Sequence, residues 1–154
     1  MSAPDVRELR PEGVEPALDL LRAVAADPEG RFFTPHPFTK EVLSALSTEP
    51  GRDLYFLMMS GDRAVAYGLL RGWNEGYVVP SLGLVVAPSE RGRGLGKLMM
   101  DFLHGAARSR GADRVGLRVH TENLRAFRLY RSLGYSFEPP DPSTGLMVGT
   151  KMLE

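Results

Sequence analysis

LGLVVAPSERGRGLG, residues 82–96, joins an apolar strand to a helix through a turn rich in glycine and arginine. The first turn of a helix leaves about four backbone N–H groups without a partner inside the helix, and the helix dipole adds positive charge there. Gly94 and Gly96 carry no Cβ, so an anion can approach the main chain closely, and Arg91 and Arg93 add charged donors. The stretch therefore predicts a binding site for a phosphate-bearing ligand.

Two better-known phosphate-binding motifs do not fit the spacing of this turn. The dinucleotide-binding motif G-x-G-x-x-G, started at Gly92 and Gly94, requires a third glycine at the position of Lys97. The P-loop motif requires Ser or Thr after its Gly-Lys pair, whereas Leu98 follows Lys97. Taken alone, the turn is compatible with an anion site or with a plain tight turn, and the residues that follow narrow the choice.

After the turn the sequence continues with an amphipathic helix, a strand and a second helix closed by glycine. An ordered set of residues runs through these elements: Leu84-Val85-Val86, then Arg91-x-x-Gly94-x-Gly96, then Asn123-x-x-Ala126-x-x-x-Tyr130-x-x-x-Gly134-Tyr135. This set resembles the GNAT superfamily of acyl-CoA-dependent N-acetyltransferases. The central match covers residues 82–138, about a third of the chain, and its order is more specific than any one of its pieces.

The resemblance implies an α/β (α+β) fold with a mixed, mostly antiparallel central sheet of about seven strands flanked by four helices. Periodicity by itself supports only an α/β or α+β class. We expect strands over residues 6–10, 53–59, 63–70, 77–86, 114–119, 135–138 and 146–153, and helices over residues 16–26, 40–46, 95–110 and 124–133.

Composition is that of an ordinary globular protein and excludes several classes. With 154 residues, 43% of them apolar and 25% charged, we expect one domain over residues 1–154. The absence of cysteine excludes disulfides, a thiolate zinc site and a cysteine nucleophile. The sequence has no run of about 18 apolar residues, and its start lacks the layout of a signal peptide, so we expect a cytoplasmic protein with no membrane partner.

The formal net charge is zero, but the charges are unevenly distributed. Residues 91–131 hold ten Lys or Arg and three Asp or Glu, and the rest of the chain is acidic in balance. A basic excess is typical of a solvated helix face and also of nucleic-acid binding. Because it coincides with the glycine-rich turn and lacks a low-complexity arm, we expect an anionic cofactor and no nucleic acid.

The resemblance implies that acetyl-CoA is the co-substrate, and nothing in the sequence indicates a metal. It assigns the pyrophosphate of coenzyme A to the turn, and the thioester and pantetheine arm to main-chain groups of the preceding strand. The strand residues are equally compatible with plain core, because such a role scarcely constrains their side chains. The cofactor-binding residues expected on this basis are Leu84, Val85, Val86, Arg91, Gly92, Arg93, Gly94, Leu95, Gly96, Asn123 and Tyr130.

Acetyl transfer requires a neutral amine, stabilisation of negative charge on the carbonyl oxygen and protonation of the departing sulfur. In enzymes that the sequence resembles, a tyrosine at the position of Tyr130 lies beside the sulfur and acts as general acid. The alternative for Tyr130 is an aromatic ring packed under the helix. Asn123 lies seven residues earlier, on nearly the same helix face, and its amide can bind the pantetheine arm, cap the helix, or do both.

The general base is the role that the sequence determines least. Ribosomal-protein alanine acetyltransferases carry a glutamate five residues before the Asn, and Arg118 occupies that position here and cannot act as a base. Glu75, at a hairpin expected to border the acceptor cleft, is the leading catalytic alternative and is equally compatible with an exposed turn carboxylate. Glu122, His120 and a water chain to backbone carbonyls are further alternatives.

The acceptor amine is expected next to the loop that joins the first two helices. Phe33 and His36 in that loop, with Trp73 and Glu75 at the hairpin, are the expected substrate-binding residues, and they could equally cap the core. The aromatic character of this side favours a small-molecule amine, such as an amino sugar or an amino acid. The alternatives are a protein or peptide N-acetyltransferase and a non-catalytic acyl-CoA sensor or subunit, and the sheet edges permit a homodimer.

Overall fold

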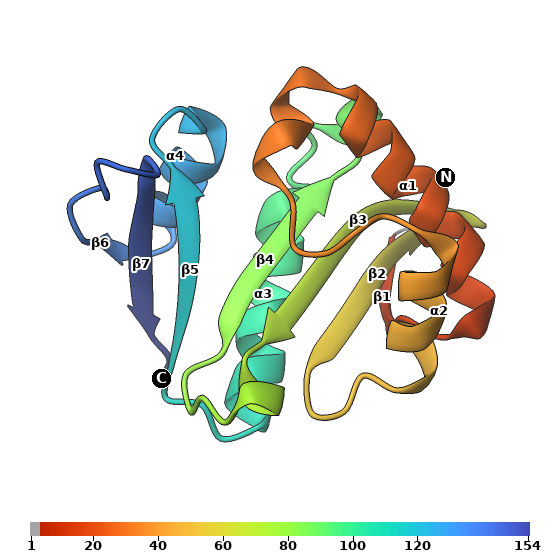
Figure 1. The fold of residues 1–154 in the computed structure, drawn as a ribbon, viewed down its shortest axis with the longest axis horizontal. Coiled ribbons are helices and arrows are strands. Elements are labelled where there is room, and N and C mark those ends of the chain that lie inside the picture. The colour runs from red at the N-terminus through yellow and green to blue at the C-terminus, as the bar shows by residue number, and fades with distance from the viewer. Residues whose placement is uncertain (1–3) are drawn as a thin grey trace.

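In the computed structural model, which describes residues 4–154, seven strands form one sheet in the order β1-β2-β3-β4-β5-β7-β6 (Figure 1). The strands are β1 (Asp5–Glu8), β2 (Leu54–Ser60), β3 (Arg63–Arg71), β4 (Ser81–Val86), β5 (Arg114–His120), β6 (Ser136–Phe137) and β7 (Leu146–Met152). The α-helices are α1 (Val14–Ala26), α2 (Lys40–Thr48), α3 (Leu95–Ser109) and α4 (Leu124–Ser132). Short 3-10 helices are η1 (Pro11–Gly13), η2 (Pro28–Phe32), η3 (Trp73–Glu75) and η4 (Pro88–Glu90).

The pairing of the strands confirms the fold class predicted from the sequence. Neighbouring strands are antiparallel except β4 and β5, which run parallel. These two strands meet only through Ser81 and Gly116, at the start of β4. Figure 1 shows β5 and β7 standing apart from the rest of the sheet beyond that point.

The two faces of the sheet are covered by different helices. On one face α1 and α2 bury Leu21 and Leu43 against Tyr67 of β3. On the other face α3 and α4 pack against β3, β4 and β5, with Met99 and Leu103 fully buried. Each such aliphatic side chain contributes about 1.5–3 kcal/mol when it leaves water. Within residues 4–154, none of the helices combines the length and the apolar character that crossing a bilayer requires.

Most element ends lie within two residues of their predicted positions, and β4 is an exception. The strand was expected from Tyr77 but begins at Ser81. Gly76 has φ +89, and Tyr77 N–H donates to Gly72 O at 3.0 Å. This turn keeps residues 77–80 out of the sheet. Thr39 caps α2, since its Oγ1 accepts a hydrogen bond from Val42 N–H at 3.2 Å.

Candidate active site

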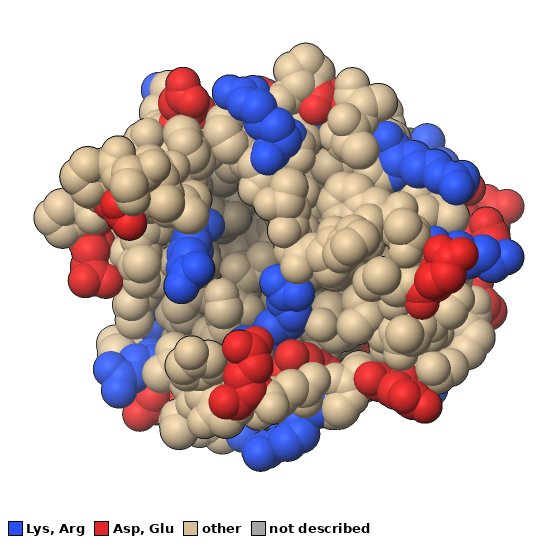
Figure 2. Space-filling model, in the orientation of Figure 1, with Lys and Arg blue, Asp and Glu red and all other residues tan. Residues whose placement is uncertain are grey.

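A cavity of about 350 Å³ opens where β4 and β5 separate. Its walls are β4, the turn that follows it, the end of β5, the start of α4 and part of η2. Figure 2 shows the hollow, with Lys and Arg side chains around it. All the cofactor-binding residues expected from the sequence line this cavity, except Arg93.

The main chain of β4 presents unpaired groups to the cavity. Along a strand the main-chain groups of alternate residues point to opposite neighbours, and the hydrogen bond from Ala87 N–H to Val65 O on β3 (2.8 Å) sets the alternation. Val85 therefore pairs with β3, whereas Leu84 and Val86 direct N–H and C=O toward β5. No strand in the described chain meets them there, because β4 and β5 pair only at the start of β4.

The glycine-rich turn directs further N–H groups at the cavity. Gly94, the N-cap of α3, has φ +78, a left-handed conformation that costs an L-residue about 1–2 kcal/mol. A Cβ at Gly94 would meet nothing within 4 Å, so the space beside it is open to an anion. The first hydrogen bond of the helix runs from Leu98 N–H to Gly94 O (3.2 Å), which leaves the N–H groups of Leu95, Gly96 and Lys97 without a helical acceptor.

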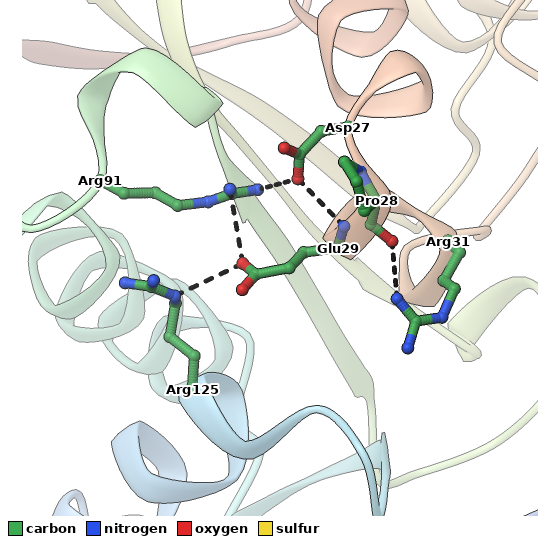
Figure 3. Close-up of polar contacts among 6 residues, drawn as sticks. All are labelled: Asp27, Pro28, Glu29, Arg31, Arg91 and Arg125. Atoms are coloured by element: carbon green, nitrogen blue, oxygen red, sulfur yellow. Dashed lines mark hydrogen bonds and ion pairs between the residues drawn. The ribbon is translucent and has the colours of Figure 1, made fainter.

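Arg91 lines the cavity within a network of carboxylates, shown in Figure 3. Arg91 Nη2 donates to Asp27 Oδ2 at 2.8 Å, and Arg91 Nη1 lies 3.4 Å from Glu29 Oε2. The same Glu29 oxygen lies 3.5 Å from Arg125 Nε at the start of α4. The hydrogen bond from Arg91 lowers the pKa of Asp27 below its usual value. The network links η2 to both walls of the cavity and already occupies both arginines.

Arg93 lies outside the cavity because its side chain turns to Glu90, which corrects its predicted place beside the anion. Arg93 Nη1 donates to Glu90 Oε1 at 2.7 Å, and Arg63 Nη2 donates to Glu90 Oε2 at 2.7 Å. The Glu90 carboxylate is nearly buried, and a buried charge is tolerated only when it is paired. Arg93 thus contributes to the turn by neutralising Glu90.

Tyr130 and Asn123 line the cavity with polar groups that are free to meet a ligand. The Tyr130 hydroxyl hydrogen-bonds no described residue, although the side chain is buried. Burial raises the pKa of Tyr130 to about 12, so the hydroxyl keeps its proton at neutral pH and can donate. Asn123 is the N-cap of α4 by position, but its side chain makes no capping hydrogen bond. The capping hydrogen bond predicted for its amide is therefore absent, and the amide is open to a ligand.

A buried pair behind Tyr130, which the sequence analysis did not predict, supports its ring. The rings of Tyr130 and Tyr135 lie 5.8 Å apart, and the Tyr135 hydroxyl is 2.7 Å from His104 Nε2. Burial lowers the pKa of His104 below its usual value. His104 therefore stays neutral at pH 7 and fixes Tyr135, against which Tyr130 packs.

The described residues around the cavity include no free carboxylate or imidazole to act as general base. Glu29 and Glu90 line it, and arginines hold both. His120 also lines it and stacks on Phe32 with ring centroids 5.4 Å apart. His120 Nδ1 accepts a hydrogen bond from Glu122 N–H at 3.1 Å, so the neutral ring carries its proton on Nε2 and has no nitrogen left to accept another.

Glu75 and Trp73 lie outside the cavity, which corrects the expectation that their hairpin borders the cleft. η3 follows the end of β3, where Arg71 pairs with Ser81, the residue at which β4 still contacts β5. The hairpin is therefore at the closed end of the cleft. Trp73 is buried beside the Arg110 guanidinium, 5.3 Å from its ring, and Glu75 is exposed to solvent.

Phe33 lines the cavity as expected, whereas His36 does not. His36 Nε2 lies 2.8 Å from the Tyr67 hydroxyl, and His36 Nδ1 lies 2.8 Å from Pro37 O. Burial lowers the pKa of His36 below its usual value. Both ring nitrogens thus have partners away from the cavity, one in the loop main chain and one on Tyr67 of β3, so His36 does not lie where the sequence predicted.

The site as a whole suits a long ligand with an anionic end. Free helix N–H groups stand at one end of the cavity, unpaired strand groups along its wall, and the Tyr130 hydroxyl inside it. Within the described chain, no cluster of three or more His, Cys, Asp or Glu side chains could hold a metal ion. The fold and the site therefore fit an extended ligand with an anionic end, lying between separated strands.

A model of the acetyltransferase (GNAT) family matches residues 18–135, and the chain belongs to this family. The match confirms the resemblance inferred from the sequence motifs. The description of the family, acetyltransferase, names the class of enzyme that the motifs predicted.

Similar proteins agree with this assignment. The chain is 34% identical over 79 residues to streptothricin acetyltransferase from Streptomyces lavendulae, a stretch that is 51% of this chain and 39% of that protein. It is 45% identical over 53 residues to mycothiol acetyltransferase from Beutenbergia cavernae, or 34% of this chain and 18% of that protein. The chain thus spans well under two thirds of either relative.

A solved structure shows the same fold over the full length of the chain. The PaiA N-acetyltransferase of Thermoplasma acidophilum, crystallised in complex with coenzyme A, superposes with a TM-score of 0.82 at 16% identity. The superposition covers 98% of this chain and 99% of that one.

Proposed function

We propose that the protein transfers an acetyl group from acetyl-CoA directly to the primary amine of a small molecule. One observation supports this most: around one cavity lie the free N–H groups of the first turn of α3, the unpaired main chain of Leu84 and Val86, and the unpartnered Tyr130 hydroxyl. The names of the two partial relatives, a streptothricin and a mycothiol acetyltransferase, favour a small-molecule acceptor over a protein tail.

The residues fit coenzyme A in order along the cleft. The N–H groups of Leu95, Gly96 and Lys97 and the Arg91 guanidinium hold the pyrophosphate, since both are donors to anionic oxygen. The unpaired groups of Leu84 and Val86 accept the pantetheine amides as a neighbouring strand would, and the Asn123 amide adds a donor from the opposite wall. When bound, acetyl-CoA supplies a thioester carbon to which the amine adds.

Proton transfer divides between Tyr130 and solvent. As the C–N bond forms and the C–S bond breaks, the nitrogen loses one proton and the sulfur gains one. Tyr130 keeps its proton at neutral pH and donates a hydrogen bond to the departing sulfur. With both cavity carboxylates held by arginines, the amine enters in its neutral form, and the proton that its nitrogen loses as the amide forms passes to water.

The test is release of free thiol from acetyl-CoA across small amines, lysine peptides and peptides with free N-termini. Release with small amines supports the proposal. Acetyl-CoA binding without release with any amine favours a non-catalytic acyl-CoA sensor. Release with peptides alone favours a protein acetyltransferase, and absence of acetyl-CoA binding contradicts both.

A further inference from the structure

Arg118 lines the cavity without a carboxylate partner, unlike the arginines near it. Asp27 and Glu29 hold Arg91, and Glu29 also holds Arg125. The side chain of Arg118 forms no hydrogen bond or ion pair with any described residue. A guanidinium is always charged and carries five N–H donors, so this group is available to an anion that enters the cavity.

Arg118 projects from the face of the sheet on which η2 lies. Its neighbours Leu117 and Val119 are buried in the core with α3 and α4, and side chains alternate between faces along a strand. His120 shares the face of Arg118, and its ring stacks on Phe32 of η2. Arg118 therefore stands on the side of the cleft that aromatic residues of η2 and its following loop enclose.

The register places Arg118 toward the acyl end of the proposed cofactor site. β4 and β5 run parallel with Ser81 opposite Gly116, so Arg118 is level with Gly83 and next to the unpaired main chain of Leu84. The end of β4, where the chain enters the glycine-rich turn, lies about 10 Å further along the strand at about 3.3 Å per residue. This separation sets Arg118 apart from the groups that suit phosphate.

We propose that Arg118 binds the carboxylate of the acceptor, so that the substrates are small amines that carry a carboxylate, such as amino acids. The inference rests on the proposed function. A guanidinium pairs with a carboxylate through two parallel hydrogen bonds, which fixes the orientation of the bound molecule and directs its amine. The single free guanidinium of Arg118, in a cavity that Phe32 and Phe33 also line, suits a ligand with one carboxylate and an apolar side chain. A phosphate dianion requires more hydrogen-bond donors.

The experiment compares each L-amino acid with its carboxamide in the thiol-release assay. The variants are Arg118→Met, which keeps an apolar stem without charge, and Arg118→Lys, which keeps charge without the bidentate geometry. Arg114→Met is the matched control, because Arg114 lies on the same strand and face but outside the cavity. Calorimetry measures acetyl-CoA binding of all four proteins.

We expect the wild type to favour at least one L-amino acid over its carboxamide about tenfold or more in kcat/KM. The reason is that the loss of a charged hydrogen bond lowers the rate about 10- to 100-fold. Arg118→Met abolishes the preference, Arg118→Lys retains part of it, and Arg114→Met leaves it intact, with acetyl-CoA affinity unchanged throughout. Equal rates with amides, silence toward every aminocarboxylate, or a preference that survives in Arg118→Met overturns the inference. Weakened acetyl-CoA binding in Arg118→Met also overturns the inference, because it would mean that Arg118 binds the cofactor and not the acceptor. Failure of the wild type to bind acetyl-CoA refutes the proposed function itself.

Discussion

Gly94→Ala separates the ligand-binding role of the glycine-rich turn from its structural role. Gly94 has φ +78, and a Cβ there would meet nothing within 4 Å. The left-handed conformation costs an alanine about 1–2 kcal/mol, which lowers the Tm of a domain of this size by about 2–6 °C. The added methyl group also occupies the space through which phosphate reaches the N–H groups of α3. One lost charged hydrogen bond is worth about 1.5–3 kcal/mol, so the Kd for acetyl-CoA should rise at least about tenfold.

Gly111→Ala is the matched control. Gly111 has φ +89 and equally open surroundings, and it follows α3 at the end opposite Gly94, about 22 Å away along the 15-residue helix. Both variants should lose similar stability by thermal denaturation, and calorimetry should show weakened acetyl-CoA binding in Gly94→Ala alone. Equal affinity in the two variants would refute the assignment of the turn to the phosphate.

Three further predictions follow from the site. Tyr130→Phe should lower kcat about 100-fold with unchanged acetyl-CoA affinity. Its Tm should also be unchanged, because the hydroxyl has no partner in the described chain. A normal kcat in stopped-flow thiol release would exclude Tyr130 as the proton donor. Glu29→Gln should tighten acetyl-CoA binding about two- to tenfold, because a carboxylate no longer competes with the cofactor for Arg91 and Arg125. The control is Glu15→Gln, which removes an exposed ion pair on α1. Equal acetyl-CoA affinities of the two variants would show that no competition exists. Burial lowers the pKa of His104, so the unfolded chain takes up a proton at this residue before the folded chain does as pH falls below 6.5, and the folded state loses stability from there downward. The denaturant midpoints at pH 7.5 and 5.5 should therefore differ less in His104→Gln than in the wild type. An equal difference in the two proteins would mean that His104 is not the group responsible.

The order of strand, glycine turn and helices was predictable because each part depends on local chemistry. A helix start needs its free N–H groups, and a left-handed position needs glycine, so residues 82–96 carried both signals in a few positions. The separation of β4 from β5 was not readable in this way. It depends on which strands pair across the sheet, and the residues of β4 look alike whether their main chain is paired or free.

The packing of individual side chains around the site was also not predictable from local sequence. Gly96 was predicted to admit phosphate, and packing also constrains it, since a Cβ there would lie 3.3 Å from Leu129 Cδ2. The amphipathic character of the helix that became α3 does not show which residues are buried: Leu98 is 53% exposed, whereas His104 is buried. A histidine can enter a core when a partner such as Tyr135 satisfies it, and that partner is 31 residues away.

Glu75 lies away from the cleft for a topological reason. Glu75 follows Trp73 in a hairpin whose position relative to the cleft depends on which end of β4 still touches β5. Because that contact is at Ser81, the hairpin closes the cleft instead of bordering it. Long-range pairing of this kind has no signature in the hairpin residues themselves.

Acetyl-CoA deuterated in its acetyl group tests whether the protein transfers the acetyl group directly to an amine. The protein is incubated with this compound and a mixture of small amines, and the products are separated by mass spectrometry. We expect a labelled N-acetyl amine whose formation Tyr130→Phe slows about 100-fold. Label that stays in acetyl-CoA, or that appears only as free acetate, would contradict direct transfer to an amine.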